Sequence, residues 1–286
     1  MRLQFQNGKR RAADEQNCLP LNMSTKNRAS GNASHENTSR FSDRVDNYVK
    51  YRPHYPEEIV GYLQNEFSLS PSHTVVDIGS GTGISSELFL RNGNRVIGVE
   101  PNAPMRERSV LLLKGYPRFE AVNATAEETG LPDRSADFIV AGQAFHWFDR
   151  QPTIKEFKRI SKPAATTVLM WNERLVSTEF ASLYDQLIID HATDYVTVDH
   201  RNIEKSAIDE FFAPNPVFLK VFANKQVFDF DGLKGRLISS SYVPNEGQAG
   251  YAPMIDALQQ LFDRFQTNGQ ITIDYDTNVY VSKAPK

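Results

Sequence analysis

The sequence predicts an α/β protein with one doubly wound, mostly parallel sheet. Two observations lead to this prediction. Short β-branched runs alternate with helical patterns between Thr74 and Trp171, and the first run leads into a glycine-rich loop. Strands that alternate with helices form βαβ units, whose crossovers place helices on both faces of a parallel sheet. The 286 residues, of which 40% are hydrophobic, suffice for the core of one large domain.

The alternating part of the chain is expected to contain five strands and three helices. The expected strands are Thr74–Ile78, Arg95–Val99, Phe119–Val122, Phe138–Ala141 and Thr166–Trp171. The expected helices lie between them, at Ile84–Arg91, Met105–Lys114 and Thr153–Ile160. Because each connection crosses over the sheet, these strands should run parallel.

The pattern changes on both sides of this part. Residues 1–40 are rich in Asn, Ser, Lys and Arg, so we expect a disordered tail before a domain of residues 41–286. Residues 41–67 have a helical pattern that breaks at the two prolines of Arg52–Pro56. After Arg174 the apolar spacing predicts four helices, at Phe180–His191, Ile203–Phe212, Leu233–Ser240 and Met254–Phe265. It also predicts two strands, at Val217–Phe222 (extending toward Phe230) and Ile271–Val281.

Composition argues against several classes of function. A net charge of -3 offers no basic surface for nucleic acid, and no apolar run is long enough to span a membrane. One cysteine and six scattered histidines lack the spacing of zinc ligands, so no metal site is expected. The single cysteine also excludes an intramolecular disulfide, which favours a reducing compartment such as the cytoplasm.

The most informative segment is Val75–Gly83, which joins the first strand to the first helix and contains glycines at positions 79, 81 and 83. Glycines at the carboxyl end of a strand let the backbone turn sharply and approach a ligand closely. A dinucleotide loop would need its third glycine at the position of Ile84, and Asp77 would oppose a pyrophosphate. The Asp77 carboxylate suits a ligand with an ammonium group instead.

The second strand leads into Glu100, about 20 residues after the glycine loop. A carboxylate at this distance can accept hydrogen bonds from both hydroxyls of a ribose. Dinucleotides and other nucleosides both need this contact, so Glu100 indicates a nucleoside without distinguishing the two. A tight structural turn followed by an exposed glutamate is the alternative to a binding site.

The motif Asp77-x-Gly79-x-Gly81-x-Gly83 resembles class I S-adenosylmethionine-dependent methyltransferases, and the likeness covers about residues 41–175. It implies a Rossmann-like seven-stranded sheet whose last strand is antiparallel. It also implies a helical roof over an acceptor pocket, built from about residues 175–212 and 233–265, and S-adenosylmethionine as cofactor. The residues it assigns to the cofactor are Asp77, Gly79, Ser80, Gly81, Gly83, Glu100, Pro101, Asn102, Met105, Thr125, Ala126, Gln143, Tyr48 and Arg52.

Two further segments narrow this likeness. Gly142–Asp149, which contains His146-Trp147-Phe148, and the Tyr/Arg/Pro-rich stretch Tyr48–Pro56 resemble the branch that contains trans-aconitate methyltransferase. The resemblance implies that the N-terminal segment with Tyr48 and Arg52 folds over the cofactor.

The implied function is transfer of a methyl group from S-adenosylmethionine to a small-molecule acceptor, such as a carboxylic acid, by in-line displacement. The enzyme then mainly aligns the reactants. His146 is the candidate general base, and packing beside Trp147 is the alternative role. Arg52 or Arg174 could anchor an anionic acceptor, although a surface ion pair is the expected role of Arg174.

Two other functions stay open at this point: an NAD(P)-dependent dehydrogenase, and a non-catalytic protein that binds S-adenosylmethionine. The intact glycine loop and Glu100 argue against the second. The expected partner is the small-molecule acceptor alone, with no nucleic acid and no membrane, and the expected state is a monomer or homodimer.

Overall fold

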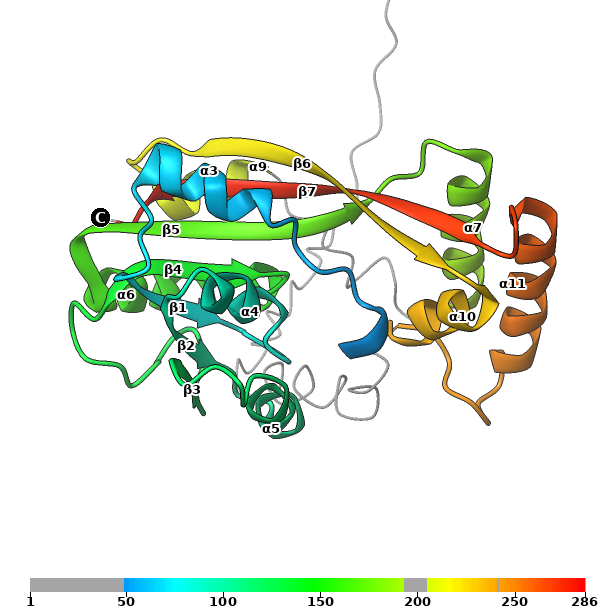
Figure 1. The fold of residues 1–286 in the computed structure, drawn as a ribbon, viewed down its shortest axis with the longest axis horizontal. Coiled ribbons are helices and arrows are strands. Elements are labelled where there is room, and N and C mark those ends of the chain that lie inside the picture. The colour runs from blue at the N-terminus through cyan, green and yellow to red at the C-terminus, as the bar shows by residue number, and fades with distance from the viewer. Residues whose placement is uncertain (1–48, 193–204, 241, 286) are drawn as a thin grey trace, which may run out of the picture.

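The computed structural model describes residues 49–192, 205–240 and 242–285 (Figure 1). Its strands are β1 (Thr74–Ile78), β2 (Arg95–Val99), β3 (Phe119–Val122), β4 (Ala136–Gly142), β5 (Ser161–Arg174), β6 (Phe218–Phe228) and β7 (Ile271–Lys283). Its helices are α3 (Glu58–Phe67), α4 (Ile84–Arg91), α5 (Ala103–Leu112), the short 3-10 helix η2 (Phe145–Trp147), α6 (Arg150–Ile160), α7 (Glu179–His191), α9 (Lys205–Phe212), α10 (Phe230–Ile238) and α11 (Tyr251–Phe265).

The seven strands form one sheet in the order β3-β2-β1-β4-β5-β7-β6. β1 to β5 pair in parallel, whereas β7 lies between β5 and β6 and is antiparallel to both (Figure 1). This topology confirms the expected doubly wound sheet with an antiparallel last strand. The parallel strands therefore end at one common edge, which we call the carboxyl edge.

Helices cover both faces of the sheet because the buried strands present apolar residues alternately to each side. In β1, Val75 packs in a core with α3 and α4, and Val76 packs in a core with α6 and α9. Both valines have no exposed surface. The continuous apolar run in β1 is thus explained by burial on both faces.

A third apolar core lies beyond the carboxyl edge. Met170 of β5 is the register partner of Gly142, the last residue of β4, and β5 then continues to Arg174 beside β7. Figure 1 shows α7, α10 and α11 gathered at this end of the long strands. These helices share a core with the ends of β6 and β7, and we call them the roof. The helices that the resemblance implied are present, and their role in covering an acceptor pocket stays a prediction.

Element boundaries differ from the sequence expectation where a cap or a strand partner decides them. Helix α5 begins two residues before Met105, because the Asn102 side chain accepts the Met105 N–H and Pro104 lies in the first turn. Helix α10 begins three residues before Leu233, because Asp229 accepts the Gly232 N–H at 2.8 Å. β5 is longer than expected because β7 pairs with its polar end.

Three expectations fall outside the described residues. They are the disordered tail of residues 1–40, the position of Tyr48, and the first two residues of the helix expected at Ile203–Phe212. The helix itself is present as α9.

Candidate functional site

The glycine loop after β1 contains three left-handed residues with different roles: φ is +68° at Gly79, +56° at Gly81 and +91° at Gly83. A Cβ on Gly79 would lie 2.6 Å from the Ala144 side chain, and one on Gly83 would lie 2.6 Å from Leu113. A Cβ on Gly81 would meet no atom within 4 Å. Gly79 and Gly83 therefore allow close packing, whereas Gly81 borders open space that a ligand can enter.

The loop is held against the end of β2. The Val99 carbonyl accepts the N–H of Gly79 at 2.8 Å and that of Ser80 at 3.2 Å. A Cβ on Gly98 would lie 2.8 Å from the Ser80 hydroxyl, so this glycine makes room for the Ser80 side chain. Ser80 is buried, and its hydroxyl points toward β2. A contact of Ser80 with a cofactor would therefore use its backbone.

Glu100 joins the glycine loop to the segment after β2. Its two carboxylate oxygens accept the N–H of Gly81 and the N–H of Asn102, both at 2.8 Å. The side chain is buried, and this burial raises its pKa despite the two backbone hydrogen bonds. The alternative of an exposed glutamate is therefore wrong. An ionised carboxylate has about four acceptor positions, so two remain for the hydroxyls of a ribose.

Asp77 is fully buried at the end of β1. Its Oδ2 accepts the hydroxyls of Ser85 at 2.7 Å and Ser86 at 2.6 Å, both from the start of α4. Its Oδ1 is also buried and has no hydrogen-bond partner among the described residues. Burial raises the Asp77 pKa to about 6, against the effect of the two hydroxyls. A cationic donor such as an ammonium group fits this unsatisfied acceptor.

The turn after β2 is organised by two residues of α5. Asn102 caps the helix through the Met105 N–H at 3.0 Å. Arg106, which the sequence interpretation missed, donates from Nη1 to the carbonyls of Glu100 at 2.7 Å and Pro101 at 3.2 Å. An arginine six residues after the acidic residue was the available signal. Met105 is buried in the first turn of α5, and its contact with a cofactor stays a prediction.

The loop after β3 reaches the same edge. Thr125 is exposed and Ala126 is buried in the core that contains α6. Two bonds to α6 and its N-terminal turn hold the loop: Glu127 accepts the Asp149 N–H at 2.9 Å, and Glu156 accepts the Thr129 N–H at 2.8 Å. The sequence interpretation did not identify these anchors, because they join residues more than 20 positions apart.

The end of β4 contributes Gln143 and His146. Gln143 has φ +57°, an uncommon conformation for a side chain other than glycine, and its Oε1 is buried without a partner among the described residues. An unsatisfied amide oxygen beside the glycine loop's strand suits contact with a ligand. The His146 ring centroid lies 4.6 Å from that of Trp147 within η2. The choice between a base and a structural role for His146 stays a prediction.

Residues 51–55, which we call the strap, connect the roof to the carboxyl edge. The Tyr51 ring packs on α10, where a Cβ on Gly235 would lie 2.0 Å from it. Arg52 donates to the Ser239 carbonyl at 3.1 Å, at the end of the same helix. The Tyr55 hydroxyl lies over the end of β4, where a Cβ on Gly142 would come within 2.7 Å.

Side-chain amides of two strands hold the strap, and a hydroxyl from a third strand holds one of these amides. Asn172 of β5 donates to the carbonyls of Pro53 at 3.2 Å and His54 at 3.4 Å. Asn224 of β6 donates to the His54 carbonyl at 2.7 Å and to the Asn172 amide oxygen at 3.0 Å. Thr277 of β7 donates to the same amide oxygen. The resemblance indicated that this segment folds over the site, but the residues that hold it were not predicted.

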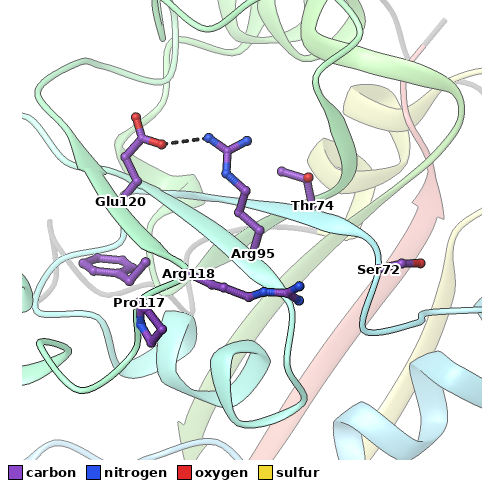
Figure 2. Close-up of a pocket in the computed structure, with 7 residues that line it drawn as sticks. Ser72, Thr74, Arg95, Pro117, Arg118 and Glu120 are labelled. Carbon is purple, nitrogen blue, oxygen red and sulfur yellow. Dashed lines mark hydrogen bonds and ion pairs between the residues drawn. The ribbon is translucent and has the colours of Figure 1, made fainter.

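A separate pocket of about 470 Å³ lies at the opposite edge of the sheet, where Thr74 begins β1 and Arg95 begins β2. Figure 2 shows Arg95 paired with Glu120 there, at 2.8 Å. Arg118 donates to the Gly93 carbonyl at 2.6 Å. Since both arginines have partners and no glycine-loop residue lines this pocket, the carboxyl edge is the better candidate for the functional site.

The structure thus brings most of the predicted cofactor residues to one edge. The glycine loop, the Glu100–Met105 turn, the loop of Thr125 and Ala126, and Gln143 follow β1, β2, β3 and β4. Arg52 belongs to the strap, but its printed side-chain bond is to Ser239 of the roof, and Tyr48 lies outside the described residues. Within the described ranges no group of His, Cys, Asp and Glu side chains could hold a metal ion, and no helix is suited to cross a membrane.

This fold and this loop geometry define a class: a doubly wound domain with the seven-stranded sheet of class I methyltransferases. Residues 76–169 match the family model described as "Methyltransferase domain". These residues therefore have the sequence pattern of a methyltransferase domain. The narrower likeness to the trans-aconitate branch stays a prediction.

Individual proteins are similar to this chain in sequence or in fold. An uncharacterized methyltransferase of Schizosaccharomyces pombe is 30% identical over 149 residues, which are 52% of this chain and 58% of that protein. A structure described as a type II methyltransferase from Anaeromyxobacter dehalogenans aligns with TM-score 0.60 and 23% identity over 82% of this chain and 98% of that one. Geranyl diphosphate C-methyltransferase from Streptomyces coelicolor, solved with S-adenosyl-L-homocysteine, aligns with TM-score 0.51 and 12% identity over 90% and 100%. The chain spans little more than half the length of the curated relatives it matches.

Proposed function

We propose that this protein is an enzyme that transfers the methyl group of S-adenosylmethionine to a small-molecule acceptor. One observation carries the proposal: two buried carboxylates flank the open side of the glycine loop, and each has acceptor capacity left for a ligand. Glu100 would accept ribose hydroxyls, and Oδ1 of Asp77 would accept the ammonium group of the methionine part. Gly81 leaves the space between them free.

The residues of the chain would bind and orient the reactants. When bound, the cofactor supplies a methyl group already activated by a sulfonium. The strap would exclude water from this edge, which favours direct attack by the acceptor. A carboxylate acceptor is ionised at pH 7 and needs no base, whereas a hydroxyl, amine or carbon nucleophile would use His146.

The alternatives fit less well. A dehydrogenase would hold a pyrophosphate at the glycine loop, where Asp77 would repel it and Ile84 replaces the third glycine of that motif. A non-catalytic binding protein needs no strap with three strands supporting it. A carboxylic acid as acceptor, a cytoplasmic location, and a monomeric or homodimeric state are part of the proposal.

Titration calorimetry of the purified protein with S-adenosyl-L-homocysteine tests the cofactor assignment. We expect binding with a Kd of about 1–100 μM, the range of ordinary cofactor and substrate sites. NADH serves as the competing ligand. Binding of NADH without binding of S-adenosyl-L-homocysteine would contradict the proposal and favour the dehydrogenase.

His146→Ala tests the proposed base. If His146 removes a proton, turnover of a hydroxyl or amine acceptor should fall by about 10²–10⁴-fold while the Kd of S-adenosyl-L-homocysteine stays within twofold. His146→Gln keeps much of the side-chain volume and serves as the matched variant. A loss of folding in both variants, measured by circular dichroism, would assign His146 the structural role of packing beside Trp147.

A further inference from the structure

The roof contains a buried cation that has no counter-ion among the residues that the structure describes. The Arg236 side chain is only 6% exposed. It donates from Nε to the Tyr275 hydroxyl at 3.1 Å and from Nη1 to the Ser240 hydroxyl at 3.4 Å, and neither partner is a carboxylate. No carboxylate among the described residues pairs with it. Because a guanidinium stays charged in proteins, burial without a counter-ion is costly, and an anionic ligand would offset that cost.

A neighbouring arginine shows the contrast. Arg174 pairs with Asp185, and its side chain is 10% exposed. Its guanidinium lies 5.0 Å from the ring centroid of Tyr184. The expected ion pair of Arg174 is present, but the expectation that it lies on the surface is wrong, because both side chains are largely buried. Since Asp185 already neutralises Arg174, Arg236 is the cation of this cluster that no described carboxylate neutralises.

Tyr184 provides a second donor beside Arg236. Its hydroxyl is buried and has no hydrogen-bond partner among the described residues. Burial raises the pKa of Tyr184 to about 12, although Arg236 and Arg174 are close enough to lower it. The hydroxyl is therefore protonated and able to donate at neutral pH. A buried donor without an acceptor destabilises the folded protein, and a hydrogen bond to a ligand oxygen would offset that cost.

The cluster adjoins the proposed cofactor site. Tyr275 is the register partner of Arg174, and Arg174 lies four residues past the β5 partner of Gly142. At about 3.3 Å per residue, this is roughly 13 Å beyond the end of β4. Helix α10, which contains Arg236, is also bonded to the strap through Arg52 and Ser239. An acceptor held here would lie between the roof and the carboxyl edge.

We propose that Arg236 and Tyr184 bind a carboxylate group of the methyl acceptor. This inference rests on the proposed function and specifies the chemical class of its substrate. A carboxylate has one negative charge, which balances Arg236, whereas a phosphate dianion would leave a buried excess of negative charge. The carboxylate held by these donors anchors the acceptor, and a different group of the same molecule receives the methyl group.

The test uses protein saturated with S-adenosyl-L-homocysteine and pairs of probes that differ in charge. Benzoate, phenylacetate and glutarate are each titrated beside the corresponding amide, with inorganic phosphate as a further probe. We expect at least one carboxylate to bind about tenfold more tightly than its amide and than phosphate. Arg236→Met should remove this preference. Tyr184→Phe deletes only the hydroxyl and should weaken binding of the carboxylate probe by about three- to tenfold.

Arg264→Met is the matched control, because Arg264 lies on the roof helix α11 with an exposed side chain and pairs with Glu179. It should bind the probes as the wild-type protein does. Equal binding of carboxylates and amides, tighter binding of phosphate, or an unchanged carboxylate preference in Arg236→Met would overturn the proposal. Tyr184→Phe decides the question if Arg236→Met does not fold. Separate titration of S-adenosyl-L-homocysteine distinguishes these results from a failure of the cofactor assignment.

Discussion

The two candidate carboxylates at the carboxyl edge each make structural hydrogen bonds and keep lone pairs that a ligand could use. Glu100 binds two backbone N–H groups and keeps further lone pairs, while Asp77 binds two serines through one oxygen only. The identity of these carboxylates could be predicted from the sequence, because their positions relative to the glycines are local. Their burial and the raised pKa of each could not, since both depend on neighbours from other strands.

Replacement of Glu100 by alanine should weaken cofactor binding. The variant loses two charge-assisted hydrogen bonds to the ribose, each of about 1.5–3 kcal/mol, and releases the N–H of Gly81. We expect the Kd of S-adenosyl-L-homocysteine, measured by calorimetry, to rise at least a hundredfold. Glu120→Ala removes an exposed carboxylate from the neighbouring strand β3 and serves as the control. Equal affinities of the two variants would refute the ribose assignment.

Asp77 should make stability depend on pH in an unusual direction. Its pKa is about 6 in the folded protein, against an ordinary value of 3.8. Between these values the folded state binds more protons than the unfolded state, so the free energy of unfolding should fall as pH rises from about 4 to 6. The fall should total about 3 kcal/mol and be complete by about pH 7. Urea unfolding of wild type and Asp77→Asn measures it, and parallel pH profiles would contradict the prediction.

Cofactor binding should show the opposite dependence on pH. Below about pH 6 the Asp77 carboxyl is protonated and loses the charge that we assign to the ammonium contact. The affinity for S-adenosyl-L-homocysteine should therefore decrease as pH falls, by up to about tenfold per pH unit, and stay flat above pH 7. Asp77→Asn should bind weakly with little dependence between pH 5 and 7. A wild-type affinity that is constant over this range would remove Asp77 from the cofactor site.

At the scale of elements, the strap depends on strands that follow it by more than 100 residues in the sequence. Asn172, Asn224 and Thr277 come from β5, β6 and β7, and their polar side chains meet because β7 pairs between the other two strands. The sequence pattern predicted a strand in each of these regions and did not distinguish the three polar residues from ordinary surface positions. Their roles became recognisable only once the register was known.

Asn172→Ala should loosen the strap. The substitution removes the donors to Pro53 and His54 and leaves the Thr277 hydroxyl without its acceptor. We expect faster hydrogen exchange at residues 51–54 and a Kd for S-adenosyl-L-homocysteine raised about three- to thirtyfold, corresponding to one or two net hydrogen bonds. Asn278→Ala, on the same strand pair but bonded to Glu173, is the control. Unchanged exchange at the strap would show that other contacts hold it.

At the scale of the whole molecule, one sheet serves two purposes. Its short parallel strands build the edge with the glycine loop, and its long strands β5, β6 and β7 extend beyond that edge to support the roof (Figure 1). The third apolar core is therefore attached to the first two through continuous strands. This arrangement positions Arg236, which has no carboxylate partner in the described part of the chain, near the proposed cofactor site without placing it on the glycine-loop scaffold itself.

Hydrogen exchange with and without S-adenosyl-L-homocysteine should distinguish the two edges of the sheet. We expect at least threefold slower exchange at residues 79–83, 100–105 and 51–55, where a bound ligand would restrict local opening. The opposite edge, lined by Ser72, Arg95 and Arg118 (Figure 2), should exchange at an unchanged rate. Protection confined to that opposite edge would move the binding site there.

The sequence by itself determined the doubly wound fold, the glycine loop and the acidic residues Asp77, near the end of β1, and Glu100, directly after β2. These features depend on local periodicity and on residue order, which a linear pattern records directly. The tertiary structure decided the support of the strap, the partner of Arg174, and the isolation of Arg236 in the roof. Those properties depend on which distant side chains come within a few ångströms of one another, and strand register and helix packing set that proximity.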